Sequence, residues 1–463
     1  MKDWIQDLVA LLGRRAVITV ERELKDSAFD LWPVAVKWKN LGEYPYKPDA
    51  IVRPVSIEQV SRLMAWAAER RIPVTPRGAG SGVVGAAIAL QGGISLDLSS
   101  LDQIISIDET NLMVKAQAGT LGSTLESALN QRGYTLNHSP QSLERSTIGG
   151  WVSTRASGQF SSRWGSIEDL VLAFTVVLPG GEIVSIKPAP RAAEGPDLRH
   201  LFIGSEGTMG VIVDVTLKIF PLPEYRRLEA FRFSGLEAGL AAMRRIAQSG
   251  LRPFLARLYD PAESKHVLKE PAFDSCLLFL GFEGPQLVAQ AEYASSLKIC
   301  HTEGGQAMGP DPVAHWMSHR FDFSFVEDRL KTVGGYAETI EIAHFWDSIL
   351  DAYSSLVDRL TPLADRVFGH FSHIYPQGTS LYLILTGQAR DDQGAQARLQ
   401  EIWDVSMRLC LEKGAAISHH HGIGLARLPY IRDSLGSEFI LLERVKRALD
   451  PNGIMNPGKF GLP

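Results

Sequence analysis

The chain has little cysteine: only Cys276, Cys300 and Cys410 occur among its 463 residues. They lie far apart and form no CxxC pair, which excludes a disulfide framework and favours a reducing compartment, the cytoplasm. No apolar run reaches the ~18 residues that a membrane span needs. We also expect no signal peptide, because residues 1–12 are amphipathic at helical spacing and contain acids, a pattern typical of a docking helix.

An excess of one charge is also lacking. The formal net charge is only −5, which gives no reason to expect a nucleic-acid partner. The partners that fit are a small-molecule or lipid-like substrate, a membrane surface contacted peripherally by the amphipathic N-terminus, and a second copy of the chain in a homodimer.

The length and the 45% apolar content are enough for more than one domain with its own core. Pro221 and Pro223 interrupt the chain where its pattern changes. We predict a helical entry segment (1–46), a first domain (47–224), a cap domain (225–425) and a C-terminal segment (426–463) that returns to the first domain. The strand and helix patterns of the cap indicate helices against an antiparallel sheet.

Glycine, in contrast, is abundant, with 42 residues. A loop rich in glycine lets the backbone approach a ligand, and several N–H groups can point at one phosphate or pyrophosphate; a tight surface turn is the alternative. Gly80, Gly82 and Gly85 also satisfy G-x-G-x-x-G, but Gly92 and Gly93 leave no room for the helix of a Rossmann site. The loop consists of Pro76, Arg77, Gly78, Ala79, Gly80, Ser81 and Gly82.

Two further segments resemble ligand-binding loops. Residues 140–170 are crowded with Ser, Thr and Gly, and a loop of that length is either disordered or functional. Its apolar anchors, including Trp151, argue against disorder. Residues 204–210 (GSEGTMG) form a third glycine-dense turn before a strand pattern. Together the three segments favour one extended ligand.

The second half of the chain carries the groups suited to chemistry. His419, His420 and His421 precede a Gly-Ile-Gly turn. Such a run can transfer protons near neutral pH, or it can be a metal-binding tract or a solvated loop. Tyr382 lies in a strand pattern, where a core position is the usual alternative to a catalytic one. Arg320 and Arg329 are candidates for binding an anionic substrate group.

These segments together resemble the vanillyl-alcohol-oxidase-type (PCMH-type) flavoproteins and, among them, the alkyldihydroxyacetonephosphate synthases (alkylglycerone-phosphate synthases). The likeness covers nearly the whole chain. The residues that carry it are GGWVSTRASG (149–158), GSIEDLV (165–171), GPDLRHLFIGSEGTMGVI (195–212), ARLYD (256–260) and SHHHGIG (418–424).

The resemblance implies an α+β fold with a two-subdomain FAD-binding domain over residues 47–224 and an α+β cap with an antiparallel sheet. It implies FAD held non-covalently, because the pyrophosphate loop contains no His or Cys for a covalent link. The FAD contacts that it implies are the loop 76–82 and Pro140, Ser142, Thr147, Gly149, Gly150, Ser153, Ser157, Gly158, Glu206, Gly207, Gly210 and Ile212.

The activity implied is the exchange of an acyl for an alkyl chain on a dihydroxyacetone-phosphate-like substrate, through a flavin N5 adduct and without net redox. Tyr382 and His419 to His421 would handle protons, and Arg257 would face the flavin; a salt bridge between the cap and the FAD domain is the alternative for Arg257. The other activity is that of an FAD-dependent 2-hydroxy-acid dehydrogenase or oxidase of the glycolate, D-lactate or D-2-hydroxyglutarate type. A flavin-free binding protein is disfavoured by the three glycine segments.

Two positions depart from the related families. The dehydrogenases hold a divalent metal with an acid before the HGIG turn; here that residue is His420, so we predict no metal. In the synthases an arginine that binds the substrate phosphate stands where this chain has Glu327. Glu327 would repel a phosphate unless Arg329 or Arg320 compensates.

Overall fold

The computed structural model describes residues 2–463 of the chain. The α-helices are α1 (Trp4–Leu12), α2 (Glu21–Asp26), α3 (Pro33–Leu41), α4 (Ile57–Arg70), α5 (Gly122–Asn130), α6 (Ile148–Thr154), α7 (Ser161–Trp164), α8 (Ile167–Leu170), α9 (Leu236–Gln248), α10 (Pro261–Leu268), α11 (Gln286–Thr302), α12 (Asp311–His319), α13 (Ser324–Lys331), α14 (Ile349–Leu360), α15 (Asp392–Lys413), α16 (Ile431–Leu435) and α17 (Glu438–Leu449). Short 3-10 turns are η1 (Leu198–Leu201), η2 (Thr361–Leu363), η3 (Leu428–Tyr430) and η4 (Lys459–Gly461).

The strands are β1 (Val17–Ile18), β2 (Ala50–Val52), β3 (Val74–Arg77), β4 (Ile94–Asp97), β5 (Ile104–Asp108), β6 (Met113–Gln117), β7 (Tyr134–Thr135), β8 (Val171–Val177), β9 (Ile183–Ser185), β10 (Val211–Lys218), β11 (Phe220–Pro221), β12 (Tyr225–Phe233), β13 (Leu255–Tyr259), β14 (Cys276–Gly284), β15 (Gln306–Gly309), β16 (Gly335–Phe345), β17 (Arg366–Ser372) and β18 (Gly378–Gln388).

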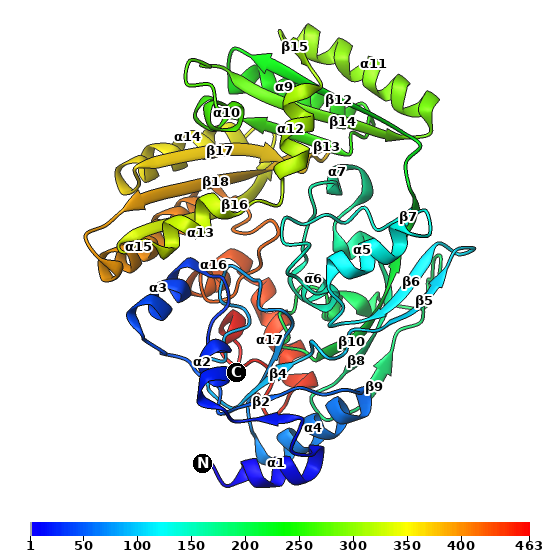
Figure 1. Cartoon of the computed structure of the whole chain (residues 1–463), viewed down its shortest axis with the longest axis vertical. Helices are drawn as coiled ribbons and strands as arrows, with labels where there is room; N and C mark the ends of the chain where they lie inside the picture. The colour runs from blue at the N-terminus through cyan, green and yellow to red at the C-terminus, as the bar shows by residue number, and fades with distance from the viewer. Residues whose placement is uncertain (1) are drawn as a thin grey trace.

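Three sheets organise these elements (Figure 1). The first has the order β1-β2-β4-β3, the second β5-β6-β10-β8-β9 and the third β15-β12-β14-β13-β17-β18-β16, while β7 and β11 form a separate pair. The first sheet is parallel except for its edge strand β1, and the strands of the second and third pair antiparallel. The predicted α+β fold with an antiparallel cap sheet is confirmed.

The first sheet holds the glycine loop. Strand β3 runs as far as Arg77, so the first two residues of the glycine loop, Pro76 and Arg77, are the last two of this strand. Helix α4 covers the sheet with Val60, Leu63 and Met64, all buried. Its N-cap Ser56 accepts a hydrogen bond from the Gln59 backbone N–H, as its sequence predicts.

The stretch 140–170 is not one long loop as expected, because three short helices (α6, α7 and α8) occupy it. Local caps explain them: the Thr147 hydroxyl accepts from the Gly150 N–H at the start of α6, and Ser166 and Asp169 form a capping box on α8. Helix α6 lies beside β10 (Figure 1), so its first residues are fixed against the second sheet.

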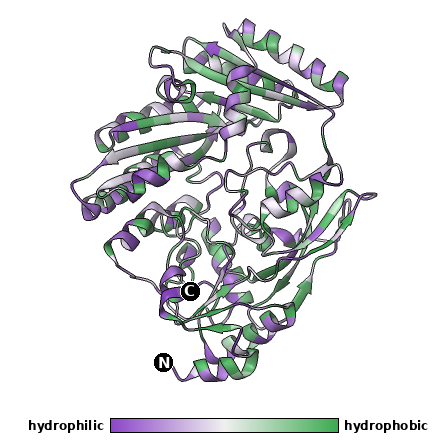
Figure 2. Ribbon diagram, in the orientation of Figure 1, coloured by the Kyte–Doolittle hydropathy of each residue, from purple (hydrophilic) through white to green (hydrophobic). Residues whose placement is uncertain are grey.

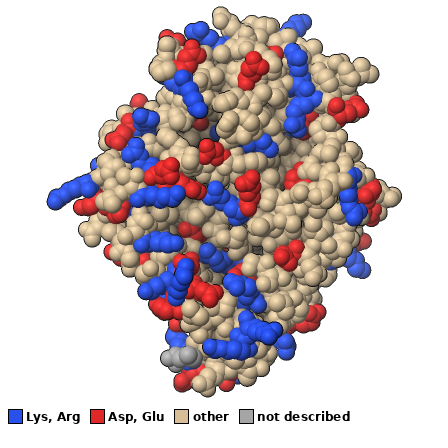
Figure 3. All heavy atoms as spheres, viewed as in Figure 1, with Lys and Arg blue, Asp and Glu red and all other residues tan. Residues whose placement is uncertain are grey.

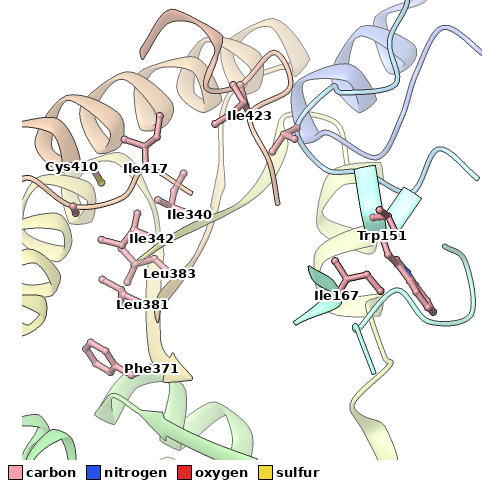
Figure 4. Close-up of a cluster of buried hydrophobic side chains, with 14 of the residues drawn as sticks. Trp151, Ile167, Ile340, Ile342, Phe371, Leu381, Leu383, Cys410, Ile417 and Ile423 are labelled. Carbon is pink, nitrogen blue, oxygen red and sulfur yellow. The ribbon is translucent and has the colours of Figure 1, made fainter. Parts of the chain in front are cut away.

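The cap sheet has one apolar face and one face turned to a cavity. Neighbouring strands pair Ile340 with Leu383 and Ile342 with Leu381, and these four side chains lie together near Ile417 and Cys410 (Figure 4). Because side chains alternate along a strand, the residues between them point to the opposite face. Tyr382 is on that face, directly opposite both Glu341 and His370 on the adjacent strands.

The surface and core follow the hydropathy of the sequence. Strands β8 and β10 are predominantly hydrophobic (Figure 2), and Lys, Arg, Asp and Glu are interspersed over the face shown in Figure 3. The three cysteines are buried and unpaired. Among residues 2–463, no helix is both long enough and apolar enough to cross a membrane.

The apolar face of the N-terminal helix packs against the rest of the protein. Helix α1 buries Ile5, Leu8 and Leu12, and its Trp4 ring lies 6.0 Å from the ring of Trp66 on α4. This agrees with a docking helix. The apolar face that was expected to permit peripheral membrane contact is therefore covered by the protein itself.

The entry segment also touches the cap. The Lys37 ammonium on α3 is fully buried and donates to Asp392 Oδ1 at 2.8 Å and to the Leu330 and Thr332 carbonyls.

The C-terminal segment returns to the first sheet, where Met455 bridges to Val74. Both ends of the chain therefore lie at the same end of the molecule (Figure 1).

Replacing Lys37 by Met should destabilise the fold, because it leaves Asp392 and two carbonyls buried without their partner. We expect a loss of about 3–5 kcal/mol, measured by urea unfolding. Lys39→Met on the same helix is the control, since Lys39 and Asp26 lie 4.0 Å apart and mostly exposed; it should change stability by less than about 0.5 kcal/mol. Equal losses in the two variants would contradict this role of Lys37.

Candidate active site

A cavity of about 720 Å³ lies between the glycine segments and the cap. Among the residues expected to bind cofactor or substrate or to act in catalysis, those that line it are Pro76, Arg77, Gly78, Ala79, Gly80, Ser81, Gly82, Pro140, Ser142, Thr147, Gly149, Gly150, Ser153, Ser157, Glu206, Gly207, Gly210, Ile212, Arg257, Arg320, Tyr382, His420 and His421. Tertiary structure thus brings together segments more than 300 positions apart.

Three expected residues do not line the cavity. Gly158 packs against the backbone of Ser139, whose nitrogen would lie 2.5 Å from an added Cβ. Arg329 points to the exposed Gln388 Oε1 at 3.4 Å, so its expected role in substrate binding is not supported. His419 lies behind His420.

Close packing explains the glycines of the loop. An added Cβ on Gly78 would lie 2.2 Å from Thr147 Oγ1, and one on Gly80, whose φ is +67°, would lie 2.1 Å from Arg77 Nη2. The Arg77 guanidinium itself turns away from a ligand role, because Nη2 donates to the Phe29 carbonyl at 2.8 Å. Arg77 therefore stabilises the loop by a hydrogen bond to the protein backbone.

A carboxyl group that sequence reasoning missed lies beneath this loop. Asp30 is buried and accepts a hydrogen bond from the Trp32 N–H, while its Oδ2 has no partner among the described residues. Burial raises the pKa of Asp30 to about 6. No motif marks this residue, because it lies in the aromatic-rich segment that precedes α3.

Glu341 anchors the histidine loop. Its carboxylate accepts hydrogen bonds from the backbone N–H groups of His419, His420 (3.1 Å) and His421 (3.0 Å) and from the Ser418 hydroxyl (2.9 Å). Arg427, fully buried, completes the site with its Nη2 at 2.8 Å from Glu341 Oε1.

The charge of Glu341 is stabilised by these partners. Burial opposes its ionisation, but Arg427 and the histidine loop outweigh burial and hold the pKa of Glu341 below its ordinary value of 4.5. Neither Glu341 nor Arg427 was predicted. The available signal was a pair of acidic residues, Glu338 and Glu341, in a strand pattern with buried apolar residues.

Glu206 connects the third glycine turn to the same loop. Its Oε1 accepts from the Ile423 N–H at 2.5 Å, and its Oε2 accepts from the Gly424 N–H at 2.9 Å. Burial raises the pKa of Glu206 despite these bonds. Glu206 lines the cavity, but its carboxylate holds the protein backbone, so it positions the histidine loop against the FAD-domain turn.

Tyr382 lies between two imidazoles. Its ring stacks on His370 with 4.9 Å between centroids and 16° between planes, and on His420 with 6.0 Å and 20°. His370 Nδ1 lies 2.9 Å from both oxygens of Glu263 and 3.3 Å from Arg257 Nη2. Arg257 thus belongs to a network in the cap and not to a salt bridge with the FAD domain.

Burial disfavours the charged forms of several groups that line the cavity. It raises the pKa of Tyr382 to about 12, lowers the pKa of His421 to about 4 and lowers the pKa of His420 well below 6.5. It also raises the pKa of Glu263 to about 7 and that of Glu338, another lining residue, to about 8. At neutral pH the cavity therefore offers a phenol and neutral imidazoles for proton transfer.

The mouth of the cavity carries an ion pair between the segment 140–170 and the cap. Arg145 Nη1 lies 2.6 Å from Glu327 Oε1, with both side chains about 40% exposed, and its guanidinium sits 4.4 Å from the Phe323 ring centre. Arg320 donates to the Met317 carbonyl and lies over Phe321. Arg145, which sequence reasoning missed, is therefore the cation nearest to Glu327, and Lys331 Nζ lies 3.8 Å from Glu327 Oε2.

Comparison with known proteins identifies the family. Residues 48–187 match the FAD binding domain family, and residues 222–460, more than half of the chain, match the C-terminal domain family of FAD linked oxidases. This protein belongs to the FAD-linked oxidase family. The flavoprotein resemblance and the FAD cofactor predicted from the sequence are confirmed.

Relatives of this FAD-linked oxidase family member differ in their named activities. It is 34% identical to YgcU, an FAD-linked oxidoreductase of Escherichia coli (strain K12), over 98% of this chain and 97% of that protein. It is 28% identical to alkyldihydroxyacetonephosphate synthase of Dictyostelium discoideum (91% and 74% covered) and 28% identical to D-lactate dehydrogenase of Anaerostipes hadrus (89% and 90% covered).

Solved structures share the fold. An alkyldihydroxyacetonephosphate synthase superposes with a TM-score of 0.83 at 23% identity, covering 98% of this chain and 84% of the other. A p-cresol methylhydroxylase gives a TM-score of 0.82 at 16% identity, covering 99% and 96%. At these identities the likeness shows the architecture alone.

The cavity fits FAD. Its volume is within the range of cofactor sites, and Gly78 and Gly80 of the loop have no room for a side chain. The backbone N–H groups of such a loop can meet a pyrophosphate. Buried atoms of lining residues that lack a protein partner are Gln159 Oε1, Arg257 Nε, Arg320 Nε, His373 Nδ1 and His421 Nδ1. An extended polar ligand would satisfy such groups.

Glu341→Gln should destabilise the protein by about 3–5 kcal/mol, because Arg427 loses its buried counter-charge. Glu338→Gln is the matched control on the same strand: Glu338 is already protonated at neutral pH, so we expect a cost of about 1–2 kcal/mol from one altered hydrogen bond. Urea unfolding at several pH values distinguishes the two.

The pH dependence follows from the lowered pKa of Glu341. The contribution of ionised Glu341 to the free energy of unfolding should be complete above pH 4.5, the ordinary pKa of a glutamate. It should be lost as the pH falls through the lower pKa that Glu341 has in the folded protein. The difference between wild type and Glu341→Gln should therefore shrink in acid. A difference that stays constant down to the acid limit of folding would contradict an ionised Glu341.

Proposed function

We propose that this flavoenzyme exchanges an acyl for an alkyl chain on a dihydroxyacetone-phosphate-like ester, as in the alkyldihydroxyacetonephosphate synthases. The arrangement of Tyr382 between His370 and His420, on the cap face that closes the cavity, is the observation that carries the proposal. The synthase relatives support it.

The loop 76–82 and the start of α6 would hold non-covalent FAD, which when bound supplies the centre that activates the substrate carbon. Tyr382 would donate or accept the proton at that carbon, because its phenol is protonated at neutral pH. His420 and His421 would move a proton to or from the alcohol or acid chain. Arg257 would orient the substrate through its free Nε.

The alternative is a 2-hydroxy-acid dehydrogenase or oxidase. The arginines Arg257 and Arg320, each with an unpartnered buried Nε, favour it because they could bind a carboxylate. The D-lactate dehydrogenase relative supports it as well.

One pair of experiments distinguishes the two activities. Holoenzyme is first incubated with acyl-dihydroxyacetonephosphate and a labelled fatty alcohol, and incorporation of label is measured. A second sample of holoenzyme is mixed anaerobically with glycolate, D-lactate and D-2-hydroxyglutarate in turn, and the flavin absorbance is followed. Exchange without bleaching supports the synthase; bleaching without exchange supports the dehydrogenase. Acid precipitation should release all FAD into solution.

Tyr382→Phe should lower turnover by about 10²-fold or more, since it removes the proton donor, while FAD content stays unchanged. Tyr336→Phe is the control on the same sheet, because the Tyr336 hydroxyl donates to the Leu363 carbonyl and does not line the cavity. Turnover is measured with the substrate that the preceding experiment identifies. Equal activity in both variants would remove Tyr382 from the chemistry.

Glu327→Arg should favour phosphorylated substrates, because it removes the carboxylate that occupies Arg145 and adds a second guanidinium at the mouth. We expect KM for a phosphorylated substrate to fall about tenfold, the effect of one charge-assisted hydrogen bond. Asp328→Arg adds the same charge at an exposed position outside the cavity. If both variants lower KM equally, the effect is general attraction and not recognition at the mouth.

A further inference from the structure

The histidine loop continues beyond the cavity wall. His420 lines the cavity, and its Nδ1 lies 2.9 Å from His419 Nδ1. His419 Nε2 in turn lies 2.7 Å from the Tyr375 hydroxyl. Neither His419 nor Tyr375 lines the cavity, and Tyr375 is partly exposed beside the exposed Pro376.

We propose that Tyr375, His419 and His420 form a proton relay between solvent and the cavity. A neutral imidazole has one donor and one acceptor nitrogen, so the two contacts between these three groups allow one direction of hydrogen bonding at a time. When Tyr375 donates to His419 Nε2, His419 donates from Nδ1 to His420 Nδ1, and the proton of His420 is on Nε2, the nitrogen left for a ligand.

The transfer balances without a further reactant. The ligand takes the proton of His420 Nε2; His420 Nδ1 takes the proton of His419 Nδ1; His419 Nε2 takes the proton of Tyr375. The Tyr375 oxygen then takes a proton from a water molecule, which leaves hydroxide in the solvent. All three groups are then neutral again, and the two histidines carry their protons on the opposite ring nitrogens. The opposite sequence removes a proton from the ligand.

The surroundings suit a relay of neutral groups. Burial lowers the pKa of His419, although Glu341 opposes the shift, and burial raises the pKa of Tyr375. Glu341 also holds the His419 and His420 backbones, so the two rings keep their contact. The charged groups with the largest effect on His419 are Glu341 and Arg155.

A metal ion is the competing explanation. His373, His419 and His420 each offer a ring nitrogen within 4.8 Å of the others. Both nitrogens of His419 are already hydrogen-bonded, however, so ligation would break one of these contacts. The hydrogen-bond pattern therefore favours the relay, which rests on the proposed function only in requiring a ligand that exchanges a proton at His420.

Nuclear magnetic resonance of the FAD-loaded enzyme with ¹⁵N-labelled histidine tests the arrangement without any substrate. In the wild type His419 should carry its proton on Nδ1 and His420 on Nε2. Tyr375→Phe removes the donor to His419 Nε2, so the tautomers of both histidines should change. Tyr430→Phe, whose hydroxyl contacts Asp404 instead, should leave them unchanged. Unchanged tautomers in Tyr375→Phe would overturn the proposal.

Kinetics then test whether the relay is used. Tyr375→Phe should lower kcat about 10-fold to 100-fold with KM unchanged, and the solvent isotope effect should change from a several-proton to a one-proton dependence. His419→Gln, which keeps hydrogen bonding but cannot pass a proton, should behave alike. An unaltered kcat and isotope effect in both variants would overturn the proposal.

Addition of Zn²⁺ distinguishes the relay from a metal site. Stoichiometric uptake of Zn²⁺ that shifts the His373, His419 and His420 signals would overturn the relay. If the enzyme shows neither alcohol exchange nor flavin bleaching, the proposed function fails, whereas the tautomer result still decides the relay.

Discussion

The buried ion pair of Glu341 and Arg427 fixes the position of the histidine loop. Removing two charges from water is unfavourable unless their hydrogen bonds are satisfied, and here the carboxylate accepts from Arg427, a hydroxyl and three consecutive backbone N–H groups. The histidine loop is therefore held by its backbone. Its imidazoles remain free to meet the cavity and one another.

The same loop is bound from the other domain. Glu206, on the third glycine turn, accepts from the N–H groups of Ile423 and Gly424, and Asn456 of the C-terminal segment donates to the Glu206 carbonyl. Because the third glycine turn and the histidine loop share one carboxylate, their separation is set. A cap motion that breaks this contact would leave Glu206 buried without partners.

Burial decides the charge state of the cavity. It lowers the pKa values of His420 and His421 and raises those of Tyr382, Glu263 and Glu338. Removal from water disfavours each charged form, and for each of these groups it is the largest cause of the shift. The cavity is thus suited to moving protons between neutral groups, while the ionised pairs lie behind it or at its mouth.

By itself the sequence determined the α+β class and the FAD-linked family, and most of the residues that it placed at the site do line the cavity. Backbone approach to a ligand favours glycine at particular positions, and Tyr382 and the histidines are residue types suited to proton transfer. The sequence did not determine Glu341, Arg427, Glu263, Asp30 or Arg145, and it misplaced Arg329. Those residues contact partners that are distant in the chain. The strand register, for example, sets Glu341 and His370 beside Tyr382. Only tertiary structure decided these contacts, since burial and register, not local pattern, determine which charges meet.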